Sequence, residues 1–439
     1  MSFKPLLTQI KPSYFSVDCG MSYVIRTSDG KFIIIDASFG EYDEPQKLIE
    51  LLRAQSPEGK TPTVAAWFFT HPHNDHIGTF TKLYDMGKDV IRIEKVYYNF
   101  PEYDWCKKTC KIDDFYAAIE FFGAEKITPQ TGDVIKIQDA VFYVIYTSQD
   151  CPKDTQNVNE TSLVMKMTLG KYSVMWLADI QKSGAEVLLQ KYPVDFFKCD
   201  IMQVGHHGYN GGSEELYRAI DPSYLLWPIP ESRYLQVLAY ECNSFLVNSE
   251  NIKEIFVSGI EQTTFDMTEE IQCAYRYFPQ KIYFNFKSEC ISECNIMCYK
   301  GGLMGYAALS ASFENNAISL ESGDIHSLLQ MVQRGQIAAS DKYNFSMIAV
   351  PDSQFEKLGI IFDCLTPTEP TSIKIYPIKH NKAEEFSLSL KVDRNNGTAI
   401  LTLNGDEIFT KLSTKKPCPI IIYTQKGKLT IKKAIFENL

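Results

Sequence analysis

The strongest constraint on this chain is a short polar segment that follows directly on an apolar run. The run Val64–Thr70 has the composition of a buried strand and leads into the hexapeptide HPHNDH, residues 71–76. In extended backbone, side chains two residues apart point the same way, so His71, His73 and Asp75 are expected to converge. His76 is expected to open a helix and to approach from another direction. Imidazoles and a carboxylate together suit Zn²⁺ and, less selectively, Fe²⁺ or Mn²⁺. A solvated polar loop is the alternative, and three histidines at this spacing argue against it.

Two hydrophobic patterns divide the chain. From Ser22 to about Met267, short apolar runs alternate with helix-like stretches, which is typical of an α/β domain with helices covering the faces of its sheets. From about Gly302, short β-rich segments are separated by turn signals, which predicts an all-β sandwich. We therefore expect a catalytic α/β domain over residues 1–267, a structured connector over 268–301 and a β-sandwich accessory domain over 302–439.

Individual elements can be predicted from the same patterns. The expected strands of the first domain are 32–36, 64–70, 95–99, 141–147, 162–167, 173–179, 200–204, 224–227 and 254–258, and the expected helices are 44–53, 77–86, 115–122, 183–191, 214–220 and 234–248. The expected strands of the last domain are 317–321, 345–350, 359–363, 373–377, 385–393, 398–403 and 420–424, with hairpin turns at 395–397 and 404–406.

The composition excludes several classes of protein. Hydrophobic residues make up 45% of the 439 residues and charged residues 22%, as in ordinary globular proteins. The apolar runs are far shorter than the ~20 residues that a membrane helix needs, and the first residues do not have the pattern of a secretory signal. A net charge of −10 disfavours bulk electrostatic binding of nucleic acid. The twelve cysteines are expected to be reduced thiols in a cytoplasmic protein.

The HPHNDH segment resembles the signature of the metallo-β-lactamase superfamily, and other segments can be compared with its pattern. KFIIIDASFG supplies Asp36 at a strand end, where the resemblance implies a residue that braces the metal loop; a turn residue is the alternative. YSVMWLADI supplies Asp179, where the family has a bridging carboxylate. DIMQVGHHGYNGGS supplies His206 and His207, of which the family pattern favours His207 as the metal ligand. The resemblance covers roughly residues 20–265 and implies an αββα sandwich, which is followed here by the all-β sandwich.

Within the superfamily, the VGHHG form and the segment NVNETSLVMKM look most like one branch. That branch contains the nuclease domain of DNA-uptake competence proteins and a bacterial phosphorylcholine esterase. In it an Asn–Ser pair often replaces another metal-binding histidine, and Asn159 and Ser162 match that pair as residues that support the ligands. No histidine lies between His76 and His206 in this sequence, which agrees with the replacement.

The resemblance implies a binuclear centre, for which we expect Zn²⁺, with Mn²⁺ or Fe as alternatives. The implied ligands are His71 and His73 for the first ion, Asp75, His76 and His207 for the second, and Asp179 between them. The first site lacks a third imidazole, so it is expected to be the weaker one and to be completed by Asn157, Asn159 or water. The expected nucleophile is a metal-bound hydroxide.

Two residues of this set have a candidate catalytic role. His206 would donate to a phosphoryl or carbonyl oxygen, or it would only bond to a loop carbonyl. Asp75 would act as a general base, although the resemblance implies that it is a ligand. Phosphoester hydrolysis, as by a phosphodiesterase, is expected mainly because the branch resemblance implies it. Hydrolysis of a carboxylic ester or lactone is an alternative, and a non-catalytic metal-binding scaffold is another.

The substrate is expected to be a small molecule, and the aromatic residues near the motifs are candidates for contacting it. Tyr103 and Trp105 lie in a segment expected over the metal edge, and Tyr209 follows the second histidine motif. Such rings could enclose a quaternary ammonium group or stack on a base, and ordinary packing is the alternative. The β-sandwich would bind a glycan or another partner, or mediate self-association.

Overall fold

The computed structural model divides into two compact units, Met1–Pro230 with Tyr240–Gln272, and Glu231–Ala239 with Cys273–Leu439. The structure describes residues 2–12, 19–41, 43–153, 155–230, 233, 237, 241–249, 251–259, 262–271, 281–283, 296–300, 311–322, 327–331, 342–363, 376–377, 383–412 and 420–439. Among these residues, no helix combines the length and the apolar composition needed to cross a bilayer. The described cysteines Cys19, Cys106, Cys110, Cys151, Cys199 and Cys242 form no disulfide bonds.

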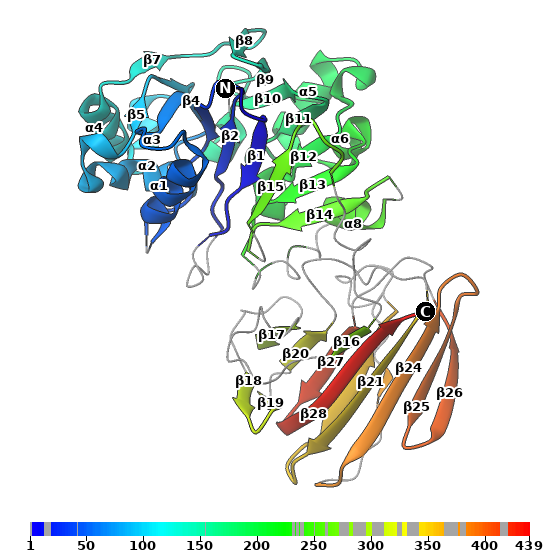
Figure 1. The fold of residues 1–439 in the computed structure, drawn as a ribbon. Helices are drawn as coiled ribbons and strands as arrows, with labels where there is room; N and C mark the ends of the chain where they lie inside the picture. The colour runs from blue at the N-terminus through cyan, green and yellow to red at the C-terminus, as the bar shows by residue number, and fades with distance from the viewer. Residues whose placement is uncertain are drawn as a thin grey trace. The chain divides into compact units, whose positions relative to one another are not determined.

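The first unit contains two mixed sheets (Figure 1). The strands of the first sheet lie in the order β15 (Thr263–Asp266), β1 (Leu6–Gln9), β2 (Tyr23–Arg26), β3 (Phe32–Ile35), β4 (Thr63–Phe69), β6 (Lys95–Tyr98) and β7 (Glu125–Ile127), and β5 (Arg92–Ile93) pairs with β4. Those of the second sheet lie in the order β14 (Glu254–Val257), β13 (Tyr224–Trp227), β12 (Ile201–Gln203), β11 (Tyr172–Trp176), β10 (Val164–Leu169), β9 (Ala140–Tyr146) and β8 (Val134–Ile137).

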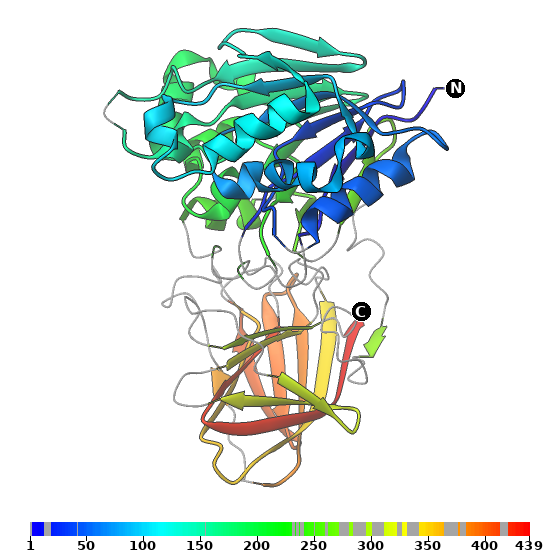
Figure 2. The ribbon, with the colours of Figure 1, turned by 90° about the vertical axis from the view of Figure 1, so that its left-hand side faces the viewer.

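Helices cover the outer faces of the two sheets, which makes the unit an αββα sandwich. Helices α1 (Glu44–Gln55), α2 (Asn74–Lys82) and α4 (Ile112–Phe122) share a core with the first sheet. Figure 2 shows these blue to cyan helices in front of the strands. Helices α5 (Lys182–Lys191), α6 (Glu214–Ile220) and α8 (Glu241–Asn248) lie beside β11 to β14 on the other side of the unit (Figure 1).

Each sheet is antiparallel on one side and parallel on the other. Strand β3 pairs in parallel with β4, and β4 with β6; strands β11, β12, β13 and β14 are also parallel. Strands β3 and β13 are buried at every position, because helices and the opposite sheet cover both of their faces. The carboxyl ends of parallel strands form the edge at which α/β proteins gather functional side chains.

The second unit is an all-β sandwich. Its larger sheet has the order β18 (Ala311–Glu314), β19 (Ala317–Ser322), β28 (Gly427–Asn438), β21 (Lys342–Pro351), β24 (Phe386–Asp393), β25 (Thr398–Leu403) and β26 (Asp406–Lys411), with β16 (Lys281–Tyr283) paired to β28. The smaller sheet has the order β17 (Ile296–Lys300), β20 (Ser327–Met331), β27 (Ile420–Gln425), β22 (Lys357–Ile361) and β23 (Tyr376–Pro377). The two sheets share one core, which includes Phe345, Leu390 and Phe436 from the larger and Leu358, Ile360 and Ile422 from the smaller.

The predicted fold class is therefore confirmed, and each predicted strand and helix overlaps an observed one. The predicted turns 395–397 and 404–406 join the hairpins β24–β25 and β25–β26. The observed strands without a predicted counterpart are β1, β2, β5, β7, β8, β15, β16, β17, β18, β20, β26 and the longest strand among the described residues, β28. The pairing of β28 with β21 shifts register between Ile348 and Ala349, so a bulge interrupts the alternation of apolar and polar residues on which strand prediction depends. Residues 234–240 of a predicted helix lie largely outside the described residues.

A second correction concerns the histidine motif. Helix α2 begins at Asn74, three residues before the predicted start, and His73 is its last extended neighbour. Asp75 therefore lies in the first turn of a helix, where side chains two residues apart do not point the same way. The motif is a strand end followed by a helix start, with two donors on each part.

Candidate metal centre

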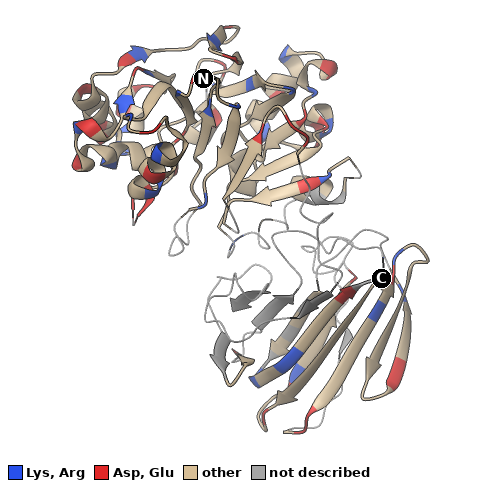
Figure 3. Ribbon diagram, viewed as in Figure 1, with Lys and Arg blue, Asp and Glu red and all other residues tan. Residues whose placement is uncertain are grey.

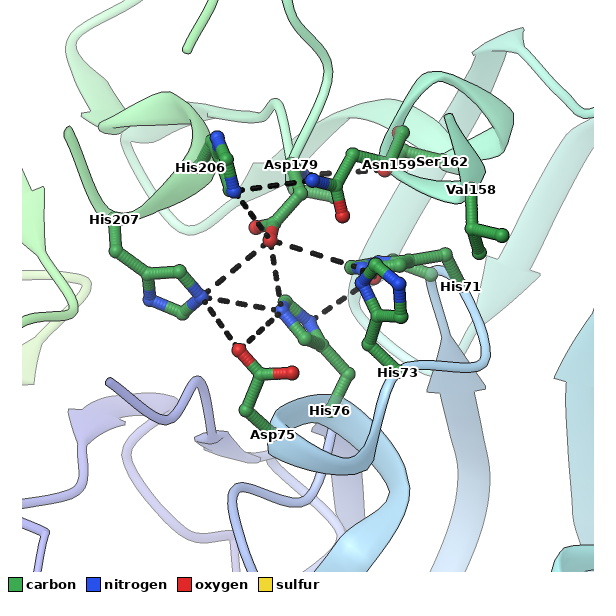
Figure 4. Close-up of polar contacts among 12 residues, drawn as sticks. His71, His73, Asp75, His76, Val158, Asn159, Ser162, Asp179, His206 and His207 are labelled. Carbon is green, nitrogen blue, oxygen red and sulfur yellow. Dashed lines mark hydrogen bonds and ion pairs between the residues drawn. The ribbon is translucent and has the colours of Figure 1, made fainter. Parts of the chain in front are cut away.

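Six predicted ligands from three separated stretches come together at the carboxyl ends of the parallel strands (Figure 4). The oxygen Oδ2 of Asp179, which follows β11, lies 3.7 Å from His71 Nε2, 3.2 Å from His76 Nε2 and 3.5 Å from His207 Nε2. His207 lies in the single turn Gly205–Gly208 after β12, with a left-handed φ of 52°. Asp179 is thus the common neighbour of imidazoles from both histidine motifs.

Asp36 fixes the orientation of two of these imidazoles. It follows β3, is fully buried, and accepts hydrogen bonds from the Thr70 amide at 2.8 Å and the Thr70 hydroxyl at 2.7 Å. Its Oδ2 lies 2.7 Å from His76 Nδ1, which therefore carries the proton. Because the Thr70 hydroxyl donates to Asp36, it accepts from His71 Nδ1 at 3.2 Å. With Nδ1 held in this way, both rings can offer Nε2 to a bound cation, and Asp36 is a bracing residue rather than a turn residue.

A backbone carbonyl does the same for His207. The carbonyl oxygen of Pro228, just after β13, lies 2.6 Å from His207 Nδ1. A carbonyl can only accept, so Nδ1 donates and Nε2 faces the centre.

The resulting arrangement fits a divalent cation. His76 Nε2 and His207 Nε2 lie 3.3 Å apart, and two nitrogen lone pairs at that distance repel unless a cation or a proton lies between them. One donor atom from each of Asp75, His76, Asp179 and His207 lies within 4.8 Å of the others. The second oxygen of Asp179 is buried and has no hydrogen-bond partner among the described residues. Two imidazoles and two carboxylates are the ligand types that Zn²⁺, Mn²⁺ and Fe²⁺ share.

The charges shift the pKa values of this four-donor group strongly. Burial lowers the pKa of His76, but Asp179, Asp36 and Asp75 outweigh it and raise the pKa to about 10. The pKa of His207 is raised well above its ordinary value against burial, because Asp179 and Asp75 adjoin it. Burial acts to raise the pKa of Asp179, but His76 and His207 hold it well below its ordinary value. In the ion-free protein, protons therefore supply the positive charge that the group requires.

His71 and His73 form a second, smaller group of donors. His71 Nε2 and His73 Nδ1 lie 3.0 Å apart. Burial lowers the pKa of both rings, so they are neutral near pH 7, as metal ligands must be. With the shared carboxylate of Asp179, this group offers one donor fewer than the group around His76.

Asn159 and Ser162 support the centre from the single turn Val158–Thr161 and its C-terminal end. The Ser162 hydroxyl donates to the Asn159 carbonyl at 2.7 Å and accepts from the Asp179 amide at 3.2 Å, so it ties this turn to the end of β11. The Asn159 side-chain nitrogen lies 3.0 Å from His206 Nε2. His206 itself lies beside the four-donor group, with Nε2 3.9 Å from Asp179 Oδ2.

The three aromatic candidates are placed differently. Tyr209 lies next to the centre, where its ring packs 6.2 Å from that of His206 and its carbonyl accepts from His206 Nδ1. Tyr103 is exposed on α3 (Tyr103–Cys106), where it bonds to Asp113 and Lys107. Trp105 is half-buried on the same turn. The structure thus brings Tyr209 to the centre, whereas the polar contacts of Tyr103 are made with surface residues.

Comparison with known proteins agrees with this geometry. Residues 19–147 match the metallo-beta-lactamase superfamily. The first unit therefore has a metallo-β-lactamase fold. Among curated proteins, the ComE operon protein 3 of Bacillus subtilis is 35% identical over 92 residues, which are 21% of this chain and 11% of that protein. The chain therefore covers only a small part of the length of that relative.

Two of the solved structures that match serve only for comparison. The metallo-beta-lactamase fold protein YhfI from Bacillus subtilis is 15% identical, with a TM-score of 0.33, over 52% of this chain and 87% of that one. CmlA, a diiron beta-hydroxylase from Streptomyces venezuelae, is 11% identical, with a TM-score of 0.32, over 52% of this chain and 45% of that one. The superfamily assignment rests on the sequence match and the donor geometry.

Three residues of the metallo-β-lactamase domain were not singled out from the sequence. Thr70 could have been identified from the sequence, because its hydroxyl group lies at the end of an apolar strand directly before His71. Gln181 lies two residues after Asp179, and its side-chain nitrogen is 2.9 Å from His206 Nδ1. Pro228 contributes only a backbone carbonyl, for which the sequence holds no signal.

Proposed function

We propose that the metallo-β-lactamase domain is a metal-dependent hydrolase that cleaves a phosphoester with water as the nucleophile. The observation that carries this proposal is the pair of buried nitrogens, His76 Nε2 and His207 Nε2, which face each other at 3.3 Å beside the Asp179 carboxylate. A divalent cation bound there lowers the pKa of a coordinated water and polarises the ester. Zn²⁺ suits the donors best, and Mn²⁺ and Fe²⁺ are alternatives.

The two carboxylates of the four-donor group differ in access. The side chain of Asp179 is 2% exposed and that of Asp75 is 22% exposed. Asp179 is thus placed to hold charge inside the centre. Asp75 is placed to accept the proton that water loses as its oxygen bonds to phosphorus, and to return it to the leaving oxygen as the other P–O bond breaks.

Charge balance favours an anionic ester over a neutral one. Asp75, Asp179 and the adjoining Asp36 bring three negative charges, fewer than the four positive charges of two divalent cations, so a loaded centre remains positive. The sequence resemblance to the branch with nucleases and phosphorylcholine esterase points the same way. Basic and acidic residues are interspersed along the described elements of both units (Figure 3), and with a net charge of −10 this favours a small substrate over nucleic acid.

The test uses the full chain after chelation and reconstitution with Zn²⁺ or Mn²⁺. Turnover of bis-p-nitrophenyl phosphate, p-nitrophenyl phosphorylcholine and a simple lactone is compared with that of His76→Ala and of Asp29→Asn, an exposed turn residue as matched control. We expect phosphoester turnover that depends on metal, a loss of at least about 100-fold in His76→Ala and no change in the control. Turnover that survives chelation would contradict the proposal. Fewer than ~0.5 metal ions per chain would favour a scaffold.

A further inference from the structure

We propose that the side-chain oxygen of Asn159 completes the metal position beside His71 and His73, and that His206 is the positioning residue that turns this oxygen inward. The inference rests on the proposed function only in that the centre holds metal. Asn159 would then contribute its side-chain oxygen as a metal ligand, and His206 would orient that side chain through its ring nitrogen Nε2. This orienting role replaces the expected role of His206 as a donor to the substrate.

The first step concerns the amide oxygen of Asn159. The residue is 8% exposed, and its buried Oδ1 adjoins His73 but makes no hydrogen bond of normal geometry to a described residue. Buried polar atoms without a partner are rare, and one at a functional site calls for an unseen ion or water. In Figure 4 this oxygen lies on the side of the His71 and His73 rings, and the amide nitrogen points away to His206.

The neighbouring amide of Asn157 does not compete for this position. Its Oδ1 accepts from the Asn159 backbone amide at 3.1 Å, and its Nδ2 donates to Gln181 Oε1 at 3.0 Å. Both ends of that side chain are therefore engaged in holding the turn. Of the two asparagines in the segment, Asn159 alone directs a side-chain oxygen toward the incomplete donor group.

The second step concerns the proton on His206. Its Nδ1 faces the carbonyl oxygen of Tyr209, which can only accept, so Nδ1 carries the proton. Nε2 is then an acceptor and receives the Asn159 Nδ2 proton at 3.0 Å. An Asn side chain whose nitrogen is held in this way must direct its oxygen to the opposite side. The carbonyl of Tyr209 thus sets the orientation of Asn159 through one imidazole ring.

One neighbour supports the opposite arrangement. Gln181 Nε2 lies 2.9 Å from His206 Nδ1 and can only donate. With the proton on Nε2 instead, His206 would accept from Gln181, the Asn159 amide would turn over, and its NH₂ group would face the metal position. In that arrangement the carbonyl oxygen of Tyr209 faces the lone pair of His206 Nδ1, which is repulsive. The Asn159 NH₂ group would also be unable to bind a cation. The two arrangements therefore predict opposite tautomers and opposite metal affinities.

The experiment titrates Zn²⁺ into the chelator-stripped full chain by calorimetry, without substrate. We expect a tight phase for the four-donor group and a weaker phase for the other position. Asn159→Ala should weaken the second phase about 10–100-fold and leave the first within about threefold. His206→Ala should weaken the same phase, and His206→Gln, which keeps an acceptor for the amide, should restore most of the loss. Asn251→Ala removes an exposed amide that bonds to Asp221 and serves as the matched control.

The double variant separates positioning from general stability. If His206 acts through Asn159, His206→Ala adds no further loss of affinity in a chain that already carries Asn159→Ala. An added loss would overturn the positioning role, and an unchanged second phase in Asn159→Ala would overturn the ligand role. Nitrogen NMR of the Zn²⁺-loaded protein supplies an independent readout: a proton on His206 Nδ1 is expected, and one on Nε2 would refute the proposal. Because no substrate is used, failure of the proposed hydrolysis would leave these results standing.

Discussion

Replacing Asp36 by asparagine perturbs the metal centre without touching a ligand. The buried carboxylate accepts from two groups of Thr70 and from His76 Nδ1. An amide has one oxygen, so its NH₂ group must face a donor, and His76 loses the acceptor that keeps Nε2 toward the centre. Loss of such an outer partner typically weakens metal affinity 10–100-fold, or about 1.4–2.7 kcal/mol. In the ion-free protein, breaking this buried pair should also lower the free energy of unfolding by about 3 kcal/mol.

Competition with a chromophoric Zn²⁺ chelator measures the first effect, and urea unfolding of the chelated protein measures the second. Asp29→Asn, in the exposed turn before β3, is the matched control and should leave both quantities unchanged. A Zn²⁺ affinity of Asp36→Asn within about twofold of the unmodified chain would refute the argument that Asp36 sets the tautomer of His76.

Three further results are expected. Because the pKa of His76 is raised to about 10 and that of His207 is raised as well, Zn²⁺ must displace protons at pH 7; affinity should rise with pH, and calorimetry in buffers of different ionisation enthalpy should detect proton release. Gly78→Ala places a Cβ against the backbone of Gly40, so urea unfolding should show a loss of about 1–3 kcal/mol; an unchanged midpoint would contradict this contact. Ser162→Ala removes the hydroxyl between two backbone groups and should cost about 1–3 kcal/mol in the same measurement, whereas an increase in stability would be inconsistent with that bridge.

The central strands of the first unit were predictable because they are buried on both faces. Runs such as Phe32–Ile35 and Tyr224–Trp227 are apolar throughout. In the helices between such strands, apolar residues recur with the helical period instead. The donor residues were predictable for a related reason, since His71, Asp179 and His207 lie just beyond such strands. The HPHNDH motif identified His71, and the family resemblance identified Asp179 and His207; their positions after strands agree with one edge of the sheets.

Other features depend on atoms that the sequence pattern does not show. The acceptor that fixes His207 is the carbonyl of Pro228, and any residue supplies a carbonyl. Asp75 was assigned to extended backbone, and only the observed helix start at Asn74 places it in the first turn. The bulge opposite Ile348 and Ala349 obscured β28. In each case a local backbone conformation, rather than a residue type, decided the outcome.

The donors of the metal centre are divided between the two layers of strands. His71 and His73 follow β4 of the first sheet, whereas Asp179 and His207 follow β11 and β12 of the second. A cation held by both sets joins segments more than a hundred residues apart, as a removable cross-link would. Removal of the ion should therefore weaken the contact between the two sheets before it disturbs either sheet. Faster amide hydrogen exchange in the loops that follow β4, β11 and β12 would record this change.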